Sequence, residues 1–343
     1  MAADDEPDAA VRRGWSLDEA VLPGRLDRLL SELRDERVPA LDGAPAGLGA
    51  LVELSYALRP HVHEGRVPTY GAIVTDEPLL ADHPVLSSDA GATLIPVADL
   101  DTKFARRFAD GETTFALRAG DTISHVVCFG RDISAEYELV GLQSTIDGLV
   151  VQRHVTGQVR VFGPSGVVRW DGIRWHHDPP LGAWLRRLGA VAPDLPVDRL
   201  RPVLRFAVHE LGGRRIGATL IWRPEGADEP GGRVEALVHN VPVLRLGQPG
   251  EAAAIAHALA QTDGAAVFDG DGRLRAAGLR LAPSPAAESA VASMSGMRHT
   301  SAVRYSYDDP TCVVIVVSDA GPVTLMHAGR VVSKVDPLDE RIG

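Results

Sequence analysis

The first part of the chain carries leucines at helical spacing on an otherwise charged segment. This pattern predicts an amphipathic helix that packs one face on a core. The Ser-Leu-Asp-Glu sequence at 16–19 is compatible with a capping box ahead of it. A second apolar segment at 48–58 predicts another helix, which ends at Pro60. The leucines of the first stripe are Leu26, Leu29, Leu30 and Leu33.

Between residues 70 and 175 the pattern changes to short apolar runs separated by Gly, Asp and Pro. Such runs predict the strands of an α/β or α+β domain. The segment 167–175 places Asp171-Gly172 between alternating residues and so predicts a tight hairpin. Its two tryptophans, Trp170 and Trp175, suit either a core or the lining of a ligand pocket, and aromatic hairpin residues are more often core. The clearest strand-like runs are 71–74, 93–97, 123–127 and 149–151.

Proline-rich stretches at 179–180 and 193–196 flank a short predicted helix at 184–188. Together they predict a linker, and we place the domain boundary near residue 190. The expected organisation is a disordered acidic arm at 1–13, an N-terminal domain at 14–190 and a second domain at 195–343.

The second domain alternates predicted helices and strands, as an α/β fold should. A helix at 200–211 precedes a strand at 216–222, a polar loop follows at 225–232, and a second helix at 251–261 leads into three further strand-like runs. The whole chain is therefore expected to be α/β, with the N-terminal domain either α/β or α+β.

The composition limits which binding partners and which cellular compartment we expect for this protein. The 343 residues are 45% hydrophobic and 24% charged, enough for about two domains with buried cores. A net charge of -11 argues against bulk electrostatic binding to nucleic acid or to an anionic membrane. No apolar run approaches the ~20 residues of a membrane helix. Only Cys128 and Cys312 occur, so we expect no disulfide framework and a soluble, cytoplasmic protein.

Three motifs carry candidate chemistry. Asp263 stands before a Gly-Ala pair at the start of a strand, where a small turn lets a ligand approach the backbone. Arg298 and His299 follow Gly296 where a loop should enter a helix, so helix N–H groups and a guanidinium can receive phosphate oxygens. Asp319 follows Ser318 at the carboxyl end of an apolar strand, an end where α/β sheets place ligands. The motifs are Asp263-Gly264-Ala265, Gly296-Met297-Arg298-His299-Thr300-Ser301-Ala302 and Val313-Val314-Ile315-Val316-Val317-Ser318-Asp319.

These motifs resemble the diadenylate cyclase domain, the nucleotidyltransferase module of the DNA-integrity-scanning cyclases. That family has an Asp-Gly-Ala turn, a Gly-Thr-Arg-His-Arg-Ala-Ala loop that opens a helix, and an apolar strand that ends in Ser-Glu-Glu. Two further pieces are similar to family strands: Arg215-Ile216-Gly217-Ala218 and Leu274-Arg275-Ala276-Ala277-Gly278. The resemblance covers roughly the last two-fifths of the chain.

The resemblance implies a fold, a reaction and partners. The domain would have a central mixed sheet with helices on both faces. It would join two ATP molecules into cyclic di-AMP and two pyrophosphates with the help of Mg²⁺ or Mn²⁺. Each subunit would hold one ATP, so activity would require a homo-oligomer, at least a dimer. The N-terminal domain would sense a signal and set the arrangement of the cyclase units.

The resemblance also implies residue roles. Asp263, Arg298 and His299 would be catalytic, and Asp263 and Asp319 would hold the metal. The nucleotide would be bound by Gly264, Ala265, Gly278, Leu279, Gly296, Met297, Arg298, His299, Thr300 and Ser318.

Four positions depart from the family pattern, and each departure removes a phosphate or metal contact. Met297 replaces Thr, Thr300 replaces Arg, Thr262 stands where a His often precedes the Asp, and Ala320 replaces the second Glu. They support an alternative, a catalytically weak or inactive regulatory protein that binds ATP or cyclic di-AMP. Simpler alternatives also stand. Asp263 and Asp319 could be ordinary turn residues that hold no metal, and Arg298-His299 could be part of a solvated surface.

A metal site in the N-terminal domain is a weaker hypothesis. His61 and His63 would point the same way on a strand, with Glu64 next to them. Because no third ligand is placed by spacing, ordinary surface or capping roles are favoured.

Overall fold

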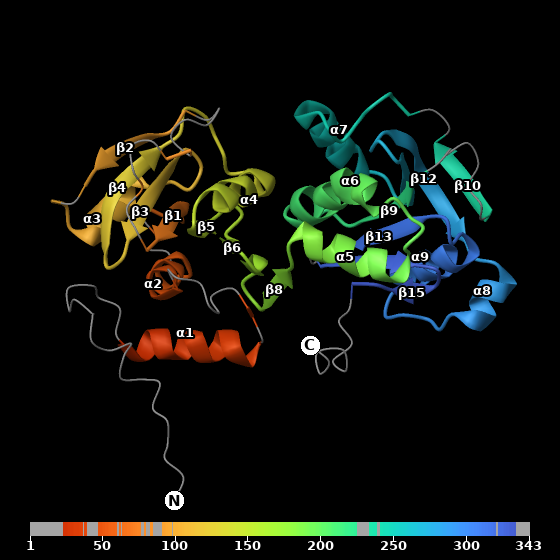
Figure 1. The fold of residues 1–343 in the computed structure, drawn as a ribbon, viewed down its shortest axis with the longest axis horizontal. Coiled ribbons are helices and arrows are strands. Elements are labelled where there is room, and N and C mark those ends of the chain that lie inside the picture. Colours follow the sequence, from red (N-terminus) through yellow and green to blue (C-terminus); the bar gives the residue numbers. More distant parts are fainter. Residues whose placement is uncertain are drawn as a thin grey trace, which may run out of the picture. The chain divides into compact units, whose positions relative to one another are not determined.

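The structure is a computed structural model that describes residues 23–36, 38–39, 47–59, 62, 64–76, 79, 83–84, 91–97, 99–224, 233–238, 241–319 and 322–333. The chain divides into two compact units, Met1–His177 and Asp178–Gly343 (Figure 1). The predicted arm at 1–13, the capping box at 16–19, His61, His63 and the polar loop at 225–232 lie outside the described residues. Among the described residues, no helix is long and apolar enough to cross a membrane.

The division falls before the boundary predicted near residue 190. The helix between the proline-rich stretches, α5 (Leu181–Val191), buries Trp184, Leu185 and Leu188 in a core cluster of the second unit. The prolines indicated a linker, but the apolar face of the helix decides where it packs. In the structure α5 therefore belongs to the second unit, and a boundary at 190 would split that unit.

The first unit is an eight-stranded mixed sheet in the order β2-β4-β3-β1-β5-β6-β7-β8. Only β1 and β3 pair in parallel among the strands with a described register. All four predicted strand runs are confirmed. The strands are β1 (Tyr70–Thr75), β2 (Thr93–Pro96), β3 (Thr114–Ala119), β4 (Thr122–Cys128), β5 (Gly148–Arg153), β6 (Val159–Gly163), β7 (Gly166–Trp170) and β8 (Trp175–Asp178).

Helices cover both faces of this sheet. Alternate residues of β1 point to opposite faces, as the two-residue period of a strand requires: Tyr70, Ala72 and Val74 join a cluster with the first two helices, whereas Ile73 joins a second cluster with α4. The predicted helices near residues 26–33 and 48–58 are confirmed. The helices are α1 (Pro23–Asp35), α2 (Gly47–Ala57), α3 (Thr102–Ala105) and α4 (Glu136–Thr145).

The predicted hairpin connects β7 to β8. The Asp171 carboxylate accepts hydrogen bonds from the Ile173 and Arg174 N–H groups at 2.8 and 2.9 Å and so closes the turn. The rings of Trp170 and Trp175 lie 5.2 Å apart between centroids and pack on the cluster that holds α1 and α2. Both tryptophans therefore serve the core, the commoner of the two alternatives.

A buried hydrogen-bond network centred on Glu53 lies inside the first unit. The Glu53 carboxylate of α2 accepts from Arg106 at 2.8 and 2.9 Å, from Arg118 at 2.6 Å and from the Tyr70 hydroxyl. Burial alone would raise the pKa of Glu53, but the two guanidinium groups lower it to about 2. The network holds one carboxylate ionised between strands β1 and β3.

The second unit is a seven-stranded mixed sheet in the order β10-β12-β11-β9-β13-β14-β15. The strands β9 and β11 are parallel, and the other neighbours are antiparallel. The strands are β9 (Ala218–Arg223), β10 (Arg233–Val238), β11 (Ala265–Asp269), β12 (Leu274–Ala282), β13 (Val313–Val317), β14 (Val323–His327) and β15 (Arg330–Val331).

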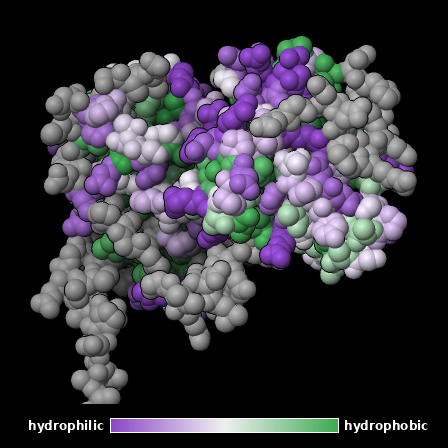
Figure 2. Space-filling model, turned by 45° about the vertical axis from the view of Figure 1, so that its right-hand side comes forward, coloured by the Kyte–Doolittle hydropathy of each residue, from purple (hydrophilic) through white to green (hydrophobic). Residues whose placement is uncertain are grey.

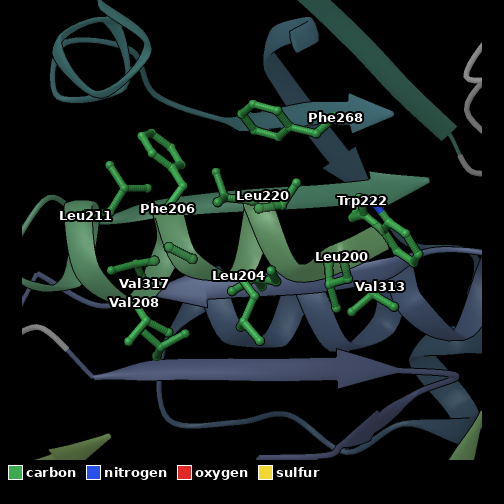
Figure 3. Close-up of a cluster of buried hydrophobic side chains, with 14 of the residues drawn as sticks. Leu200, Leu204, Phe206, Val208, Leu211, Leu220, Trp222, Phe268, Val313 and Val317 are labelled. Atoms are coloured by element: carbon green, nitrogen blue, oxygen red, sulfur yellow. The ribbon is translucent and has the colours of Figure 1, made fainter. Parts of the chain in front are cut away.

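Helices lie on both faces of this sheet too, as expected. One face carries α5, α6 (Arg201–Arg205) and α7 (Pro249–Leu259), and the other carries α9 (Met297–Asp308), while α8 (Pro285–Ala290) precedes α9. Figure 3 shows side chains from the first face, among them Leu204 and Leu211, gathered with Leu220 and Trp222 of β9 and Val317 of β13. On the face drawn in Figure 2, hydrophilic side chains are interspersed among hydrophobic ones.

The helix predicted at 200–211 is built from three consecutive pieces. A 3-10 turn (Val197–Leu200) leads into α6, which continues as a π-helical segment (Phe206–Gly212). The strand predicted from residue 216 begins at Ala218, because the Ile216 N–H closes the helix end onto the Leu211 carbonyl at 2.8 Å. The helix predicted at 251–261 is confirmed as α7.

Candidate functional site

Three strands bring the predicted motifs to one edge of the second sheet. Ala265 pairs in parallel with Thr219, so β11 and β9 begin at the same edge. Val317 pairs antiparallel with Ala218, so β13 ends there. Of these three strands, only β13 has its carboxyl end at this edge, as predicted for Asp319. The strands β9 and β11 have their amino ends there. The motifs at 215–218, 263–265 and 318–319 therefore meet.

The helix α9 begins beside this edge. Gly296 precedes its first residue with φ 122°, a left-handed backbone that favours glycine. Unpaired N–H groups of a first helical turn and the helix dipole attract anions. Met297 and Arg298 in this turn are exposed. The predicted loop-to-helix transition is therefore in place for an anionic ligand.

Thr300 closes the loop ahead of α9. Its hydroxyl accepts from the Met294 N–H at 3.0 Å and lies within hydrogen-bonding distance of the Met294 and Gly296 carbonyl oxygens, at 3.2 and 3.0 Å. Sequence reasoning placed Thr300 among the nucleotide contacts. In the structure its hydroxyl is engaged by its own loop, so its first role is to fix the loop's shape.

His299 is half-buried and turns toward the sheet. Its Nε2 lies 3.4 Å from the Thr324 hydroxyl of β14. A contact at this distance is weak, but it comes from a strand that starts at the same edge. Thr324 was not predicted, since nothing in its sequence context distinguishes it.

Arg298 and Asp319 form an ion pair across the edge. Arg298 Nη1 donates to Asp319 Oδ1 at 3.1 Å. The pair lies over Gly217, because a Cβ built at Gly217 would overlap Asp319 Oδ1 and come within 2.6 Å of Arg298 Nη1. The sequence motif contained Gly217, but its place under the ion pair becomes visible only in three dimensions. A side chain at this position would displace both charged groups.

Gly264, just before β11, lies where its backbone comes very close to the backbone of β12. Its φ is 98°, and a Cβ there would lie 2.8 Å from the Gly278 carbonyl carbon and 2.8 Å from the Leu279 oxygen. Ala265 pairs with Leu279, and the register of β11 and β12 then shifts near Gly278, whose φ is 72°. The close approach of two backbones therefore requires these glycines whether or not a nucleotide binds.

Asp263 is exposed at the same edge. Within the described part of the chain, its carboxylate makes no hydrogen bond or ion pair. It lies on the β11 side of β9 and Asp319 on the β13 side, and because neighbouring strands are about 4.8 Å apart, β11 and β13 are separated by about 10 Å. The Asp319 carboxylate lies over Gly217, which precedes β9, and so extends from the β13 side toward the β11 side.

No complete metal cage is present among the described residues, where no three His, Cys, Asp or Glu side chains are grouped to hold an ion. Mg²⁺ is commonly held by only one or two carboxylates, with waters and substrate phosphates as its other ligands, so Asp263 and Asp319 are the residues of this edge that have the right chemistry for it. Of the remaining departures, Thr262 is half-buried before Asp263, and Ala320 lies outside the described residues.

Two family models match the chain, one in each unit. Residues 205–331 match the model described as DisA bacterial checkpoint controller nucleotide-binding, and residues 28–178 match the model described as Probable sensor domain DACNK. The second unit belongs to the diadenylate cyclase domain family. The resemblance drawn from the motifs is thereby confirmed, and the N-terminal unit matches a sensor-domain family, as the resemblance implied.

Solved structures provide weaker likenesses. A hypothetical membrane spanning protein from Bacillus cereus is similar at 18% identity over 37% of this chain, with a TM-score of 0.29. The match spans 59% of the Bacillus cereus chain. DacA from Staphylococcus aureus, a double cysteine mutant, is similar at 20% identity over 39% of this chain and 84% of that one, with a TM-score of 0.25. No curated protein matches the sequence. The family assignment rests on the two family models.

Proposed function

We propose that the chain is a diadenylate cyclase that condenses two ATP molecules into cyclic di-AMP and two pyrophosphates. The observation that best supports this is that the Arg298–Asp319 ion pair lies over Gly217 at the same edge of the sheet to which the strand register brings Asp263, although these residues are far apart in the sequence. In the reaction, the ribose 3′-hydroxyl of one ATP attacks the α-phosphate of the other, and pyrophosphate leaves. Such a transfer is accelerated mainly by positioning and by charge stabilisation.

Asp263 and Asp319 would hold a divalent cation, Mg²⁺ or Mn²⁺, together with phosphate oxygens. The cation would neutralise phosphate charge and orient the triphosphate. With Asp319 holding the cation, the Arg298 guanidinium would be available to phosphate oxygens. His299 and the first turn of α9 supply further donors, and the Thr300 hydroxyl keeps that turn in place.

The reaction needs two nucleotides, and the proposed site binds one. Two copies of the second unit must therefore face each other, so the active form would be a dimer or a larger homo-oligomer. We further propose that the first unit senses a signal and sets this facing arrangement, a role supported by its match to a sensor-domain family.

A second candidate function is a catalytically weak or inactive regulator that binds ATP or cyclic di-AMP. Two observations favour it. The Thr300 hydroxyl is engaged by its own loop, and Met297 offers an apolar side chain that is 90% exposed at the helix start. Neither side chain offers a cation to phosphate oxygens.

Calorimetry combined with product analysis separates the two functions. The purified chain is titrated with ATP and, separately, with cyclic di-AMP, each in the presence of Mn²⁺, and the sample incubated with ATP is then analysed by mass spectrometry. A cyclase binds ATP and converts it to cyclic di-AMP, and Asp263→Asn removes that conversion. A regulator of the second kind binds one or both nucleotides but forms no cyclic di-AMP from ATP. A chain that binds neither nucleotide contradicts both functions.

A further inference from the structure

The helical segment before β9 ends in a Schellman motif. The Ile216 N–H donates to the Leu211 carbonyl at 2.8 Å, and the Arg215 N–H donates to the Gly212 carbonyl at 3.2 Å. This pattern puts Arg215 at the position after the helix cap, where the backbone turns left-handed with φ 58°. Ile216 packs against the cluster that contains Leu211, which is the apolar contact that accompanies the motif.

Arginine is not what this backbone favours. Glycine is the usual residue here, because in a left-handed conformation the Cβ of an L-residue crowds the following carbonyl oxygen. Among the described residues, Glu64 and Ala328 are the other non-glycine residues with positive φ. Both bonds of the turn use backbone atoms, so the helix end does not require a guanidinium. Backbone strain of this kind is concentrated at functional sites, so Arg215 is a candidate for a role in ligand binding.

Arg215 lies beside the proposed nucleotide site. It precedes Gly217 by two residues, so the backbone places it within about 7 Å of that glycine. Its side chain is exposed. The edge already holds the carboxylates of Asp263 and Asp319, and Arg298 is paired with one of them. A triphosphate approaching two carboxylates needs further positive charge, and a planar guanidinium can bind two phosphate oxygens at once.

We infer that Arg215 is a phosphate-binding residue of this site and grips the triphosphate of ATP together with Arg298. The inference rests on the proposed function, since it takes ATP as the ligand. It assigns a role to a residue of the segment 215–218 to which the family resemblance gave none. It also gives a reason for the strained backbone, because the turn places Arg215 just before β9 and two residues from Gly217.

The test uses a substitution that suits the turn and removes the guanidinium. Arg215→Gly is expected to melt at the wild-type temperature or above, because glycine relieves the left-handed strain. It is expected to bind ATP about tenfold more weakly or worse, since a hydrogen bond to a charged group contributes that much. Calorimetry with ATP and Mn²⁺ and thermal unfolding of the full chain provide the two readouts.

Two control variants isolate the cause. Arg214→Ala removes a neighbouring exposed charge that pairs with Glu210 at 2.8 Å, and Ala328→Gly relieves the same kind of strain in the β14–β15 turn at the opposite edge. Both should bind ATP like the wild type.

The outcomes are distinct. Wild-type ATP affinity in Arg215→Gly, or an equal loss in Arg214→Ala, overturns the inference and leaves the proposed function standing. Weaker binding together with a lower melting temperature also overturns it, because the arginine would then serve the turn. A wild-type chain that binds no ATP contradicts the proposed function, and the inference falls with it.

Discussion

Arg298 donates to Asp319 at 3.1 Å and so joins the first turn of α9 to the end of β13. The Asp319 side chain is 81% exposed, and exposed ion pairs contribute at most about 1 kcal/mol. The pair is therefore weak enough to open when both groups find better partners. We propose that the triphosphate and the cation are those partners, so that binding of one should assist binding of the other.

Removing the Asp319 charge should release Arg298. We expect Asp319→Asn to bind ATP about fivefold more tightly than the wild type when EDTA removes divalent cations, which corresponds to about 1 kcal/mol. Asp263→Asn is the matched control, since it removes a carboxylate from the same edge but leaves the ion pair. Calorimetry in EDTA compares them. Equal gains in the two variants would reduce the effect to general repulsion and remove the role of the pair.

Gly217 should tolerate no side chain without loss of binding. The Cβ of Gly217→Ala would displace the Arg298–Asp319 pair, both of whose members have exposed side chains that can move, so the fold should persist while ATP binding falls about tenfold or about 1.4 kcal/mol. Gly247→Ala is the control, because no atom lies within 4 Å of the Cβ it would add. Similar ATP affinity in both variants would show that the space above Gly217 does not serve the ligand.

Thr300 should act through the loop before α9. Thr300→Val keeps the shape of the side chain but leaves the Met294 N–H without its acceptor, so it should cost about 1–3 kcal/mol of stability and weaken ATP binding by loosening the helix start. Thr300→Ser retains the hydroxyl and should restore both. Thermal unfolding and ATP titration of the two variants measure this, and a fully stable Thr300→Val would contradict it.

The first unit should lose stability in acid through Glu53. Its pKa is about 2 in the folded chain against about 4.3 when unfolded, so its contribution is complete above pH 4.3 and is lost as the pH falls through about 2. Glu53→Gln leaves two buried arginines without their carboxylate and should cost about 3–5 kcal/mol at pH 7. Urea unfolding between pH 7 and 2 should show the two proteins converging at low pH. A constant difference would exclude the ionised carboxylate as the cause.

Much of the fold and of the site edge could be predicted because the signals are local. Apolar runs such as 71–74 and 149–151 define strands by their own composition, and the Asp-Gly-Ala turn can be recognised from three consecutive residues. The Arg298–Asp319 pair over Gly217 could not be predicted, since it depends on how β9 and β13 align. The hydrogen bonds of Thr300 within its own loop could not be predicted either, since the motif gives the position of Thr300 but not the direction of its hydroxyl, and its contact with the nucleotide stays a prediction. The helix α5 was predicted to be part of a linker because prolines flank it, although its apolar face packs in the core of the second unit.

The proposal that this chain is a diadenylate cyclase can be tested by measuring its product. The full chain is incubated with ATP and Mn²⁺ or Mg²⁺, and cyclic di-AMP is quantified by mass spectrometry, with Asp263→Asn treated in parallel and checked for an unchanged melting temperature. We expect the wild type to form cyclic di-AMP only when the cation is present and the variant to form none. No product from the wild type, or equal product from a folded Asp263→Asn, would contradict it.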